Sequence, residues 1–424
     1  MTTLSGTSAA VATAATPRAF SARPNARIGA KSTQVAPIVI LGGGPIGLVC
    51  ALLFARQGFS SQLVDARPLE ALQRDRRLLA LSRGSLQVLE SLLGPAFVAS
   101  APIERVHVSS CGDWGATHLG AQDFGGVVLG ATVWYADLVA VLARAVGQHS
   151  RIAVQRPRRA IEVRQSIDHV RIALDDGSTL QGSLAIDAEG SPPPLRQARH
   201  CALLAELEFA QAWPAGQAIE RFTRDGPLAL LPLPSPVAAA DHLVERSAPN
   251  TRASMIWCLP AALAQARKEM VQDELLACIG RTLGPRIGAP TAIGERSMFA
   301  LLTHRLRRIC EHRLVHLGNA AQSLHPVAGQ GFNLGIRDCA GLVESLVDAG
   351  ALDGGDMLSA LKRYSARRRL DRAIVPSLTS ALPRVFSSSA PPIVLARSAA
   401  LVALDLVPGL RREFARLLMF GAPR

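Results

Sequence analysis

Aromatic residues, paired cysteines and long apolar runs are scarce in this chain of 424 residues. Aromatic residues make up only 4% of it, the basic residues are scattered and no nucleic-acid-binding motif occurs, so we expect no nucleic acid partner. No apolar run reaches about 18 residues, which predicts that no helix spans a membrane. The seven cysteines form no CxxC pair, which argues against a disulfide framework or a metal site and favours a reducing compartment.

Acidic residues are absent before position 65, and the first 35 residues are rich in Ala, Ser and Thr. A compact apolar core, as found in secretory signals, is missing too. We interpret 1–35 as a disordered N-terminal extension of a cytoplasmic bacterial protein. The alternative is a mitochondrial transit peptide, which would place the protein in the mitochondrial matrix. The basic residues of that peptide would be Arg18, Arg23, Arg27 and Lys31.

Apolar residues, in contrast, are abundant. Hydrophobic residues make up 49% of the chain and charged residues 19%, which is typical of a globular protein. The length leaves room for about two or three domains. A formal net charge of +13 predicts an anionic partner, and with nucleic acid set aside this is a phosphate-rich cofactor or an acidic membrane surface.

One stretch near the N-terminus has the order of a dinucleotide-binding unit. The apolar run Ile38-Val-Ile-Leu41 predicts a buried strand, and Gly42-x-Gly44-x-x-Gly47 follows it directly. We expect Gly42 to make the tight turn, Gly44 to admit the pyrophosphate, and Gly47 to let helix and strand pack closely. A second strand then ends at Asp65, whose carboxylate is placed to accept hydrogen bonds from an adenosine ribose. Only one such fingerprint occurs, so a second dinucleotide would have to bind without a Rossmann domain of its own.

A second glycine-rich stretch, 318–338, follows the apolar run 313–317, which predicts a buried strand. Gly329 and Gly331 permit backbone angles that other residues resist, and after Gln330 the apolar spacing becomes helical. A helix starting at such a turn directs free N–H groups and the positive end of its dipole at whatever binds there. The negative charge of a reduced flavin would suit this position. The plainer interpretation is an ordinary strand–loop–helix connection.

The remaining pattern predicts an α/β protein, α+β overall, with interleaved domains. Asp75 to Ser82 should open a helix, and 151–187 should form short strands with a hairpin. Strand-like segments between 220 and 258 predict a largely antiparallel sheet that forms the far wall of a ligand pocket. The expected parts are a discontinuous Rossmann-like domain with a parallel sheet (36–190 and 300–350), a substrate-side antiparallel-sheet domain (191–299) and a C-terminal helical region (351–424).

The C-terminal region is basic and apolar. Residues 356–385 have helical spacing, and the apolar segment 392–420 carries four arginines. The pattern is typical of helices packed on their own domain with a solvated basic face; the alternative is a surface that rests on an anionic membrane. The four arginines are Arg397, Arg411, Arg412 and Arg416.

With both glycine-rich elements present, the sequence resembles the FAD-dependent aromatic hydroxylases. Among these it is most similar to the ubiquinone-biosynthesis hydroxylases, in particular their 6-methoxyphenol branch, from about residue 37 to residue 421. The chain departs from the family at Glu189 and Asn319, where relatives carry Asp. The resemblance rests on both glycine motifs and on Asp75-x-Arg77, Glu220-Arg-Phe-Thr223 and Gly226-Pro-Leu-Ala-Leu-Leu-Pro232.

The resemblance implies the cofactors, the substrate and the site. The discontinuous domain would bind FAD, NAD(P)H would visit as a transient reductant, and O₂ would supply one oxygen atom to the ring of a lipophilic prenylated phenol in ubiquinone biosynthesis. Such a substrate comes from a membrane surface or a biosynthetic complex, which favours a peripheral location on the inner membrane. His325 is the candidate catalytic, substrate-facing group, and a structural histidine is the alternative. The predicted cofactor-binding residues are Gly42, Gly44, Gly47, Asp65, Arg77, Asn319, Pro326, Gly329, Gln330 and Gly331.

Two alternative functions stay open. The first is a flavin dehydrogenase or reductase on the same fold that does not use O₂, which O₂ consumption in step with product formation would exclude. The second is a non-catalytic, flavin-holding subunit of a biosynthetic complex, motivated by Glu189 and Asn319. Near-complete FAD occupancy, with NAD(P)H-driven reduction stimulated by a prenylphenol, would argue against the second.

Overall fold

The apolar run before the first glycine motif forms the central strand of a six-stranded sheet, ordered β20-β21-β12-β1-β2-β8. Its neighbours on both sides pair with it in parallel, as predicted. All four residues of β1 are buried, as expected for a parallel sheet covered on both faces. Only β20 runs antiparallel. The strands are β1 (Ile38–Leu41), β2 (Ser61–Val64), β8 (Ile152–Gln155), β12 (Leu184–Asp187), β20 (Cys310–Glu311) and β21 (Leu314–His316).

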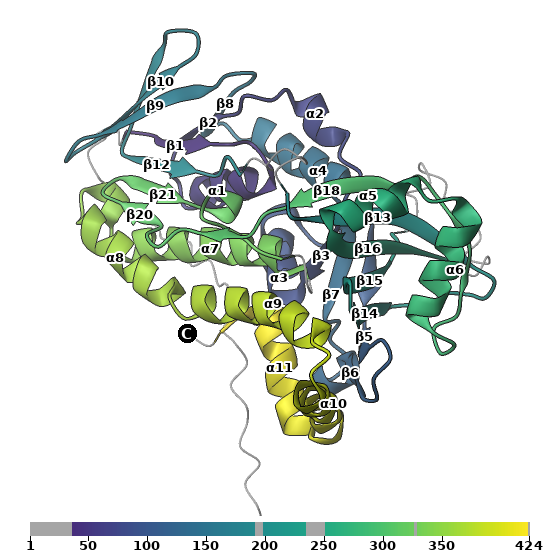
Figure 1. Ribbon diagram of the computed structural model, residues 1–424. Helices are drawn as coiled ribbons and strands as arrows, with labels where there is room; N and C mark the ends of the chain where they lie inside the picture. The colour runs from purple at the N-terminus through teal and green to yellow at the C-terminus, as the bar shows by residue number, and fades with distance from the viewer. Residues whose placement is uncertain (1–35, 191–197, 235–250, 326–328, 423–424) are drawn as a thin grey trace, which may run out of the picture. The chain divides into compact units, whose positions relative to one another are not determined.

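The structure is a computed structural model that describes residues 36–190, 198–234, 251–325 and 329–422. The predicted extension 1–35 and the predicted site residue Pro326 lie outside these ranges. Figure 1 shows the order of the elements along the chain.

Different elements cover the two faces of the parallel sheet. Val39 and Leu41 pack against a three-stranded antiparallel sheet, which contains the predicted hairpin. Ile40, on the opposite face, lies beside Gly47 of helix α1, and α1 packs against α4 and α7. The elements are β9 (Ala160–Gln165), β10 (Val170–Leu174), β11 (Thr179–Gly182), α1 (Pro45–Arg56), α4 (Tyr135–Gly147) and α7 (Gln330–Asp348).

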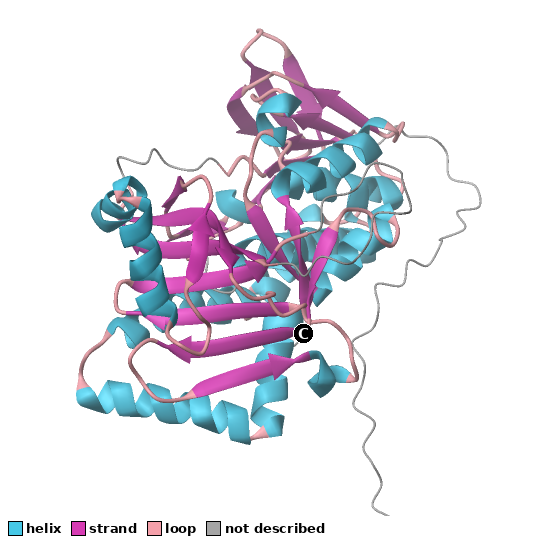
Figure 2. Ribbon diagram, turned by 90° about the vertical axis from the view of Figure 1, so that its right-hand side faces the viewer, coloured by secondary structure: helices cyan, strands magenta, loops and turns pink. Residues whose placement is uncertain are grey.

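The predicted antiparallel sheet has eight strands, in the order β17-β13-β16-β15-β14-β5-β6, with β18 also paired to β13. Its strands are among those drawn in magenta in Figure 2. One face packs on α5 (Ala261–Glu269) and α6 (Gln272–Leu283). Strand β5 pairs in parallel with β14, so the sheet also contains residues before 191. The predicted domain boundaries stay a prediction. The strands are β5 (Arg105–Ser110), β6 (Ala116–Gly120), β13 (His200–Phe209), β14 (Gln217–Thr223), β15 (Gly226–Pro232), β16 (Arg252–Pro260), β17 (Pro290–Ile293) and β18 (Ser297–Leu301).

The prediction that a helix begins at Asp75 is wrong. The preceding segment is a strand, β3, whose backbone groups pair with β7, and helix α3 (Arg83–Leu93) begins only after it. Ser82 caps this helix, since its hydroxyl accepts a hydrogen bond from the N–H of Ser85 at 3.4 Å. The elements are β3 (Leu78–Ser82), β4 (Ser100–Ile103), β7 (Gly130–Trp134) and the short helix α2 (Leu69–Gln73).

The C-terminal region is helical, as predicted, and its last helices pack on the antiparallel sheet. Helix α9 contacts β14 and β15, and α10 contacts β5 and β6 (Figure 1). Within the described ranges no single helix is long and apolar enough to cross a membrane; α10 and α11 pass that test only as a pair bent by 99°. The helices are α8 (Met357–Arg368), α9 (Asp371–Ser387), α10 (Pro391–Leu406) and α11 (Pro408–Phe420).

Candidate active site

A cavity of about 770 Å³ lies where the predicted site residues come together. Its walls are the loops after β1 and β12, the N-terminus of α7, one face of the eight-stranded sheet and helices α9 to α11. Loops that follow parallel strands are the usual ligand site of α/β folds, and the volume lies in the range of about 300–1,000 Å³ typical of small-molecule sites.

The three glycines of the first motif have different surroundings. A Cβ atom at Gly42 would lie 2.5 Å from the carbonyl oxygen of Ala188, and one at Gly47 would lie 1.9 Å from the carbonyl oxygen of Gly42. At Gly44 the nearest atom to such a Cβ is the hydroxyl of Tyr135, at 3.8 Å. Gly42 and Gly47 are therefore required by the fold itself, whereas Gly44 borders open space in the cavity.

Asp65 is buried beneath the glycine loop and fixes its shape. Its carboxylate accepts hydrogen bonds from the N–H of Gly43 at 2.6 Å and from the N–H of Arg67 at 2.7 Å. Arg156 donates from its guanidinium to the carbonyl of Gly43. The predicted contact between Asp65 and a ribose stays a prediction. Arg67, which we did not predict, lines the cavity.

Arg77 lines the same cavity and is held in place on three sides. Its guanidinium donates to the carboxylate of Asp75 at 2.6 Å and lies 4.9 Å from the ring centroid of Tyr135 and 5.1 Å from that of Phe299. Burial, the largest effect, raises the pKa of Tyr135. Arg77 is therefore a positioned cation at the cavity wall.

Helix α7 points its N-terminus into the cavity, as predicted from the second glycine motif. Gly329 (φ +60°), Gln330 and Gly331 all line the cavity. Asn319 lines it too, and a Cβ at Gly190 would lie 2.2 Å from the Cβ of Asn319, so this glycine admits the close approach. The N–H groups of a first helical turn and the helix dipole favour an anionic or strongly polar group here. Together with the space at Gly44, these residues fit a flavin dinucleotide.

Asn333 joins this helix to strand β3 and was missed from the sequence. Its amide oxygen accepts from the N–H of Ser82 at 2.8 Å, and its amide nitrogen donates to the carbonyls of Ala80 at 2.9 Å and Gly329 at 2.8 Å. Asn333 is 1% exposed. Its partners in strand β3 lie more than 250 positions away, so no local pattern in the sequence indicates this role.

Known proteins share this arrangement. The family model described as "FAD binding domain" matches residues 235–375. Ubiquinone hydroxylase UbiL of Rhodospirillum rubrum is 29% identical over 91% of this chain and 90% of its own length. Ubiquinone biosynthesis monooxygenase COQ6, mitochondrial, of Mus musculus is 27% identical over 91% of each chain. The chain is therefore similar to ubiquinone hydroxylases over most of its length.

The comparison with solved structures agrees with the predicted fold. The crystal structure of pqsL, a probable FAD-dependent monooxygenase from Pseudomonas aeruginosa, superimposes with a TM-score of 0.67 at 18% identity. It covers 87% of this chain, and this chain covers 99% of it. The predicted family, α/β fold and FAD cofactor are confirmed. The residues predicted to bind FAD stay predictions, although Gly44, Arg77, Asn319, Gly329, Gln330 and Gly331 all line the cavity.

Replacing Asn333 with alanine should weaken the link between helix α7 and strand β3, next to the predicted flavin site. The change would leave the N–H of Ser82 and two half-buried carbonyls without this partner. Each unsatisfied group costs about 1–3 kcal/mol, so we expect the free energy of unfolding to fall by at least about 2 kcal/mol and FAD to dissociate more readily. Chemical denaturation and flavin fluorescence titration measure the two effects. Unchanged FAD affinity in the variant would contradict the proposed role.

His325, the predicted catalytic group, is not among the described residues that line the cavity. Burial, and to a smaller extent His200, lowers its pKa to about 4, so its ring is neutral at pH 7. Its buried Nδ1 atom has no hydrogen-bond partner among the described residues. The catalytic role stays a prediction without a contact to support it, and Pro326 lies outside the described residues.

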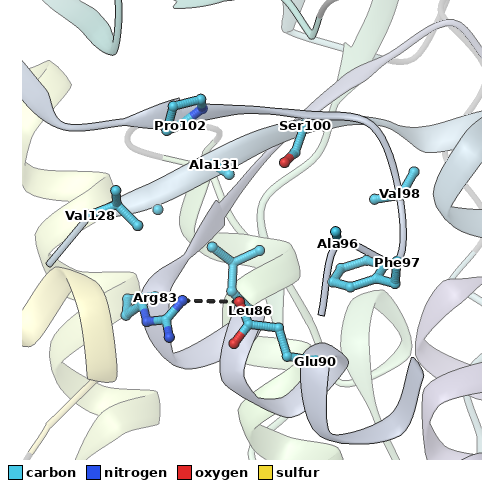
Figure 3. A pocket seen from close by; sticks show the side chains of 11 residues that line it. Arg83, Leu86, Glu90, Ala96, Phe97, Val98, Ser100, Pro102, Val128 and Ala131 are labelled. Atoms are coloured by element: carbon cyan, nitrogen blue, oxygen red, sulfur yellow. Dashed lines mark hydrogen bonds and ion pairs between the residues drawn. The ribbon is translucent and has the colours of Figure 1, made fainter. Parts of the chain in front are cut away.

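A second, smaller pocket of about 150 Å³ lies between α3 and strands β4 and β7 (Figure 3). Arg83 and Glu90 form an ion pair at 3.0 Å beside it. None of the predicted site residues lines this pocket, and it is too small for a dinucleotide.

The second glycine motif ends in a buried ion cluster, which consists of Arg337, Asp338, Arg368, Asp371 and Arg372. Arg368 bridges both carboxylates, donating to Asp338 and to Asp371 at 2.6 Å each. Asp371 also accepts from Arg337 at 3.0 Å and from the N–H of Ala422 at 3.1 Å. The cluster therefore ties α7 to α8, α9 and residue Ala422, and holds the helix whose N-terminus lines the cavity.

Proposed function

We infer that this flavoprotein hydroxylates the aromatic ring of a prenylated phenol in ubiquinone biosynthesis, with NAD(P)H as reductant and O₂ as oxidant. One observation carries the proposal: a single cavity extends from the N-terminus of α7, where the flavin is predicted to bind, to a broad wall of apolar side chains. The names of the similar proteins from Rhodospirillum rubrum and Mus musculus support this substrate class.

The residues of the chain would bind, orient and exclude water. FAD, when bound, supplies the electron transfer and the activation of O₂. Gly44 would leave room for its pyrophosphate, and the N–H groups at the start of α7 would stabilise negative charge on the flavin ring. Apolar side chains of the eight-stranded sheet, among them Leu231 and Ile256, would keep water from the reacting ring. Because only one dinucleotide fingerprint occurs, NAD(P)H would visit without a Rossmann domain of its own.

The test uses purified protein loaded with FAD and a phenol carrying a short prenyl chain. We expect NAD(P)H oxidation to accelerate when the phenol is added, and the product to gain one oxygen atom by mass spectrometry. A flavin dehydrogenase would oxidise NAD(P)H without a hydroxylated product. A non-catalytic flavin-holding subunit would leave the flavin oxidised in the presence of both compounds.

Two of the arginines predicted to form a solvated basic face are instead tied to the protein. Arg397 is buried, binds Asp113 at 2.6 Å and donates to carbonyls of α9 and the residue after it. Arg411 binds Asp123 at 2.9 Å. The predicted solvated face is therefore wrong at these two positions, because partners distant in sequence reach them. Arg411 is also unsuitable for a charge-reversal test of membrane binding.

The corner between α10 and α11 is the better candidate for a membrane contact. Leu406 is 73% exposed, Leu410 51% and Val407 48%, and Arg412 is exposed nearby. Apolar side chains next to a basic residue suit an anionic bilayer surface. We propose that this corner touches the inner membrane. Since similar proteins occur in a bacterium and in mitochondria, the bacterial cytoplasm and the mitochondrial matrix remain alternative compartments.

Replacing both Leu406 and Leu410 with glutamate should abolish flotation with anionic liposomes. Neither residue lines the cavity, so the FAD content should stay unchanged. Ile167→Glu is the matched control, because Ile167 is 90% exposed and lies between β9 and β10. Wild-type protein that never floats, or a double variant that floats as well as the control, would overturn the membrane proposal.

A further inference from the structure

One part of the cavity is mainly apolar, and it lies between the eight-stranded sheet and helices α9 and α10. We call it the apolar arm. It is defined by the lining residues Val108, Phe222, Leu382, Phe386, Leu401 and Leu404. Two polar residues, Thr117 and Glu220, also line the cavity beside Val108. We infer that the apolar arm binds the hydrocarbon chain of the substrate, and that the chain enters between α9 and α10. The inference rests on the proposed function, and it specifies where the hydrocarbon chain of the substrate lies.

The chemistry of the arm favours a chain without polar groups. Phe222 and Phe386 stack with ring centroids 4.1 Å apart, and Leu401 completes this small core. The one charged side chain that α10 places on the cavity is Arg397, and its guanidinium is already bound to Asp113 and to backbone carbonyls. Transfer of each CH₂ group from water into the mainly apolar surroundings is favourable.

The arm opens to solvent between the two helices. Val385 of α9 and Ala400 of α10 both line the cavity and are both exposed. Arg397 fixes this mouth, since it donates to the carbonyls of Val385 and Phe386 at 2.8 and 2.9 Å and to that of Ser388 at 2.7 Å. These hydrogen bonds therefore hold α9 and α10 in fixed positions at the mouth.

The size of the cavity limits how much of the chain it holds. About 770 Å³ must also accommodate the flavin ring and the phenol, so a long polyprenyl chain extends beyond it. Outside the mouth, α10 carries further exposed apolar side chains, including Ile393 at 40% and Leu395 at 60% exposure. The distal part of the chain would lie along this helix or remain in the bilayer.

The test compares two alanine-to-tryptophan variants on one helix. Ala400→Trp fills the mouth, whereas Ala399→Trp places the same side chain at an exposed position that does not line the cavity. We expect kcat/KM for a long-chain prenylphenol to fall about tenfold or more in the first variant, or about 1.4 kcal/mol. The same phenol with a methyl group in place of the chain should be hydroxylated at the wild-type rate by both variants.

A binding measurement keeps this inference separate from the proposed reaction. Fluorescently labelled geranylgeraniol, which has a chain but no phenol ring, should bind wild type and Ala399→Trp alike and bind Ala400→Trp about tenfold more weakly. If this holds while no phenol is hydroxylated, the reaction is wrong and the chain site stands. Equal binding by both variants, or equal losses on the methyl and long-chain phenols, would overturn the inference.

Discussion

Replacing Gly44 with valine should give a folded protein that purifies without colour. The backbone at Gly44 is extended (φ −72°, ψ 178°), so a β-branched residue fits the fold, and its Cβ meets no atom closer than 3.8 Å. The added side chain would occupy the space through which the dinucleotide passes. We expect FAD affinity to fall at least about a hundredfold, or about 2.8 kcal/mol, with the melting temperature of the apoprotein unchanged.

Two other glycine-to-valine changes separate binding from folding. Gly147→Val, at the end of α4, has no neighbouring atom within 4 Å of the new Cβ and should change neither property. Gly47→Val would place its Cβ 1.9 Å from a backbone carbonyl oxygen and should prevent folding. A yellow Gly44→Val protein with wild-type FAD affinity would show that the pyrophosphate binds elsewhere.

Replacing Asp371 with alanine should strongly destabilise the folded protein. The change would leave Arg337 and Arg368 without a shared carboxylate in a site where both are less than 10% exposed. Uncompensated buried charge costs about 3–5 kcal/mol, which should appear as a lower free energy of unfolding in urea. The matched control is Glu295→Ala, because the Arg76–Glu295 pair is 86% and 81% exposed and should contribute less than about 1 kcal/mol. Equal losses in the two variants would contradict the role of the ion cluster.

The effect of the Asp371 substitution should depend on pH. Burial opposes ionisation of this carboxyl, but Arg337 and Arg368 outweigh burial and lower its pKa below the ordinary value of 3.8. A carboxyl with a lowered folded-state pKa stabilises the protein above the unfolded-state pKa, and this contribution disappears as pH falls through the folded-state value. The difference between wild type and Asp371→Ala should therefore be constant near neutral pH and shrink below pH 3.8. Urea titrations at several pH values measure it.

Local patterns in the sequence predicted the cofactor half of this protein well. A strand followed by glycines at fixed spacing, and the helix after Gly329, depend on residues close together in the chain, so propensity and spacing were sufficient. The start of α3 was wrong for the opposite reason. Leu78 to Ser82 have spacing that suits a helix, but pairing with β7, some 50 residues further along, makes them a strand.

Partners distant in sequence explain the remaining errors. Arg397 meets Asp113 across 284 positions, and Asn333 meets Ser82 across 251, and no local pattern reports such pairs. Arg397 and Arg411 are therefore anchored within the protein, which leaves Leu406 and Leu410 as the candidates for a membrane contact. No local pattern indicates the apolar arm either, because it forms where α9 and α10 pack against β14 and β5.

The most direct test of the central claim is the origin of the new hydroxyl oxygen. Protein loaded with FAD would be supplied with NAD(P)H, a prenylated phenol and isotopically labelled O₂ in unlabelled water. We predict that one labelled oxygen atom enters each product molecule, with one NAD(P)H consumed per hydroxylation. Product without label, or NAD(P)H oxidation that yields only H₂O₂ or a reduced acceptor, would contradict the assignment of this protein as a ring monooxygenase.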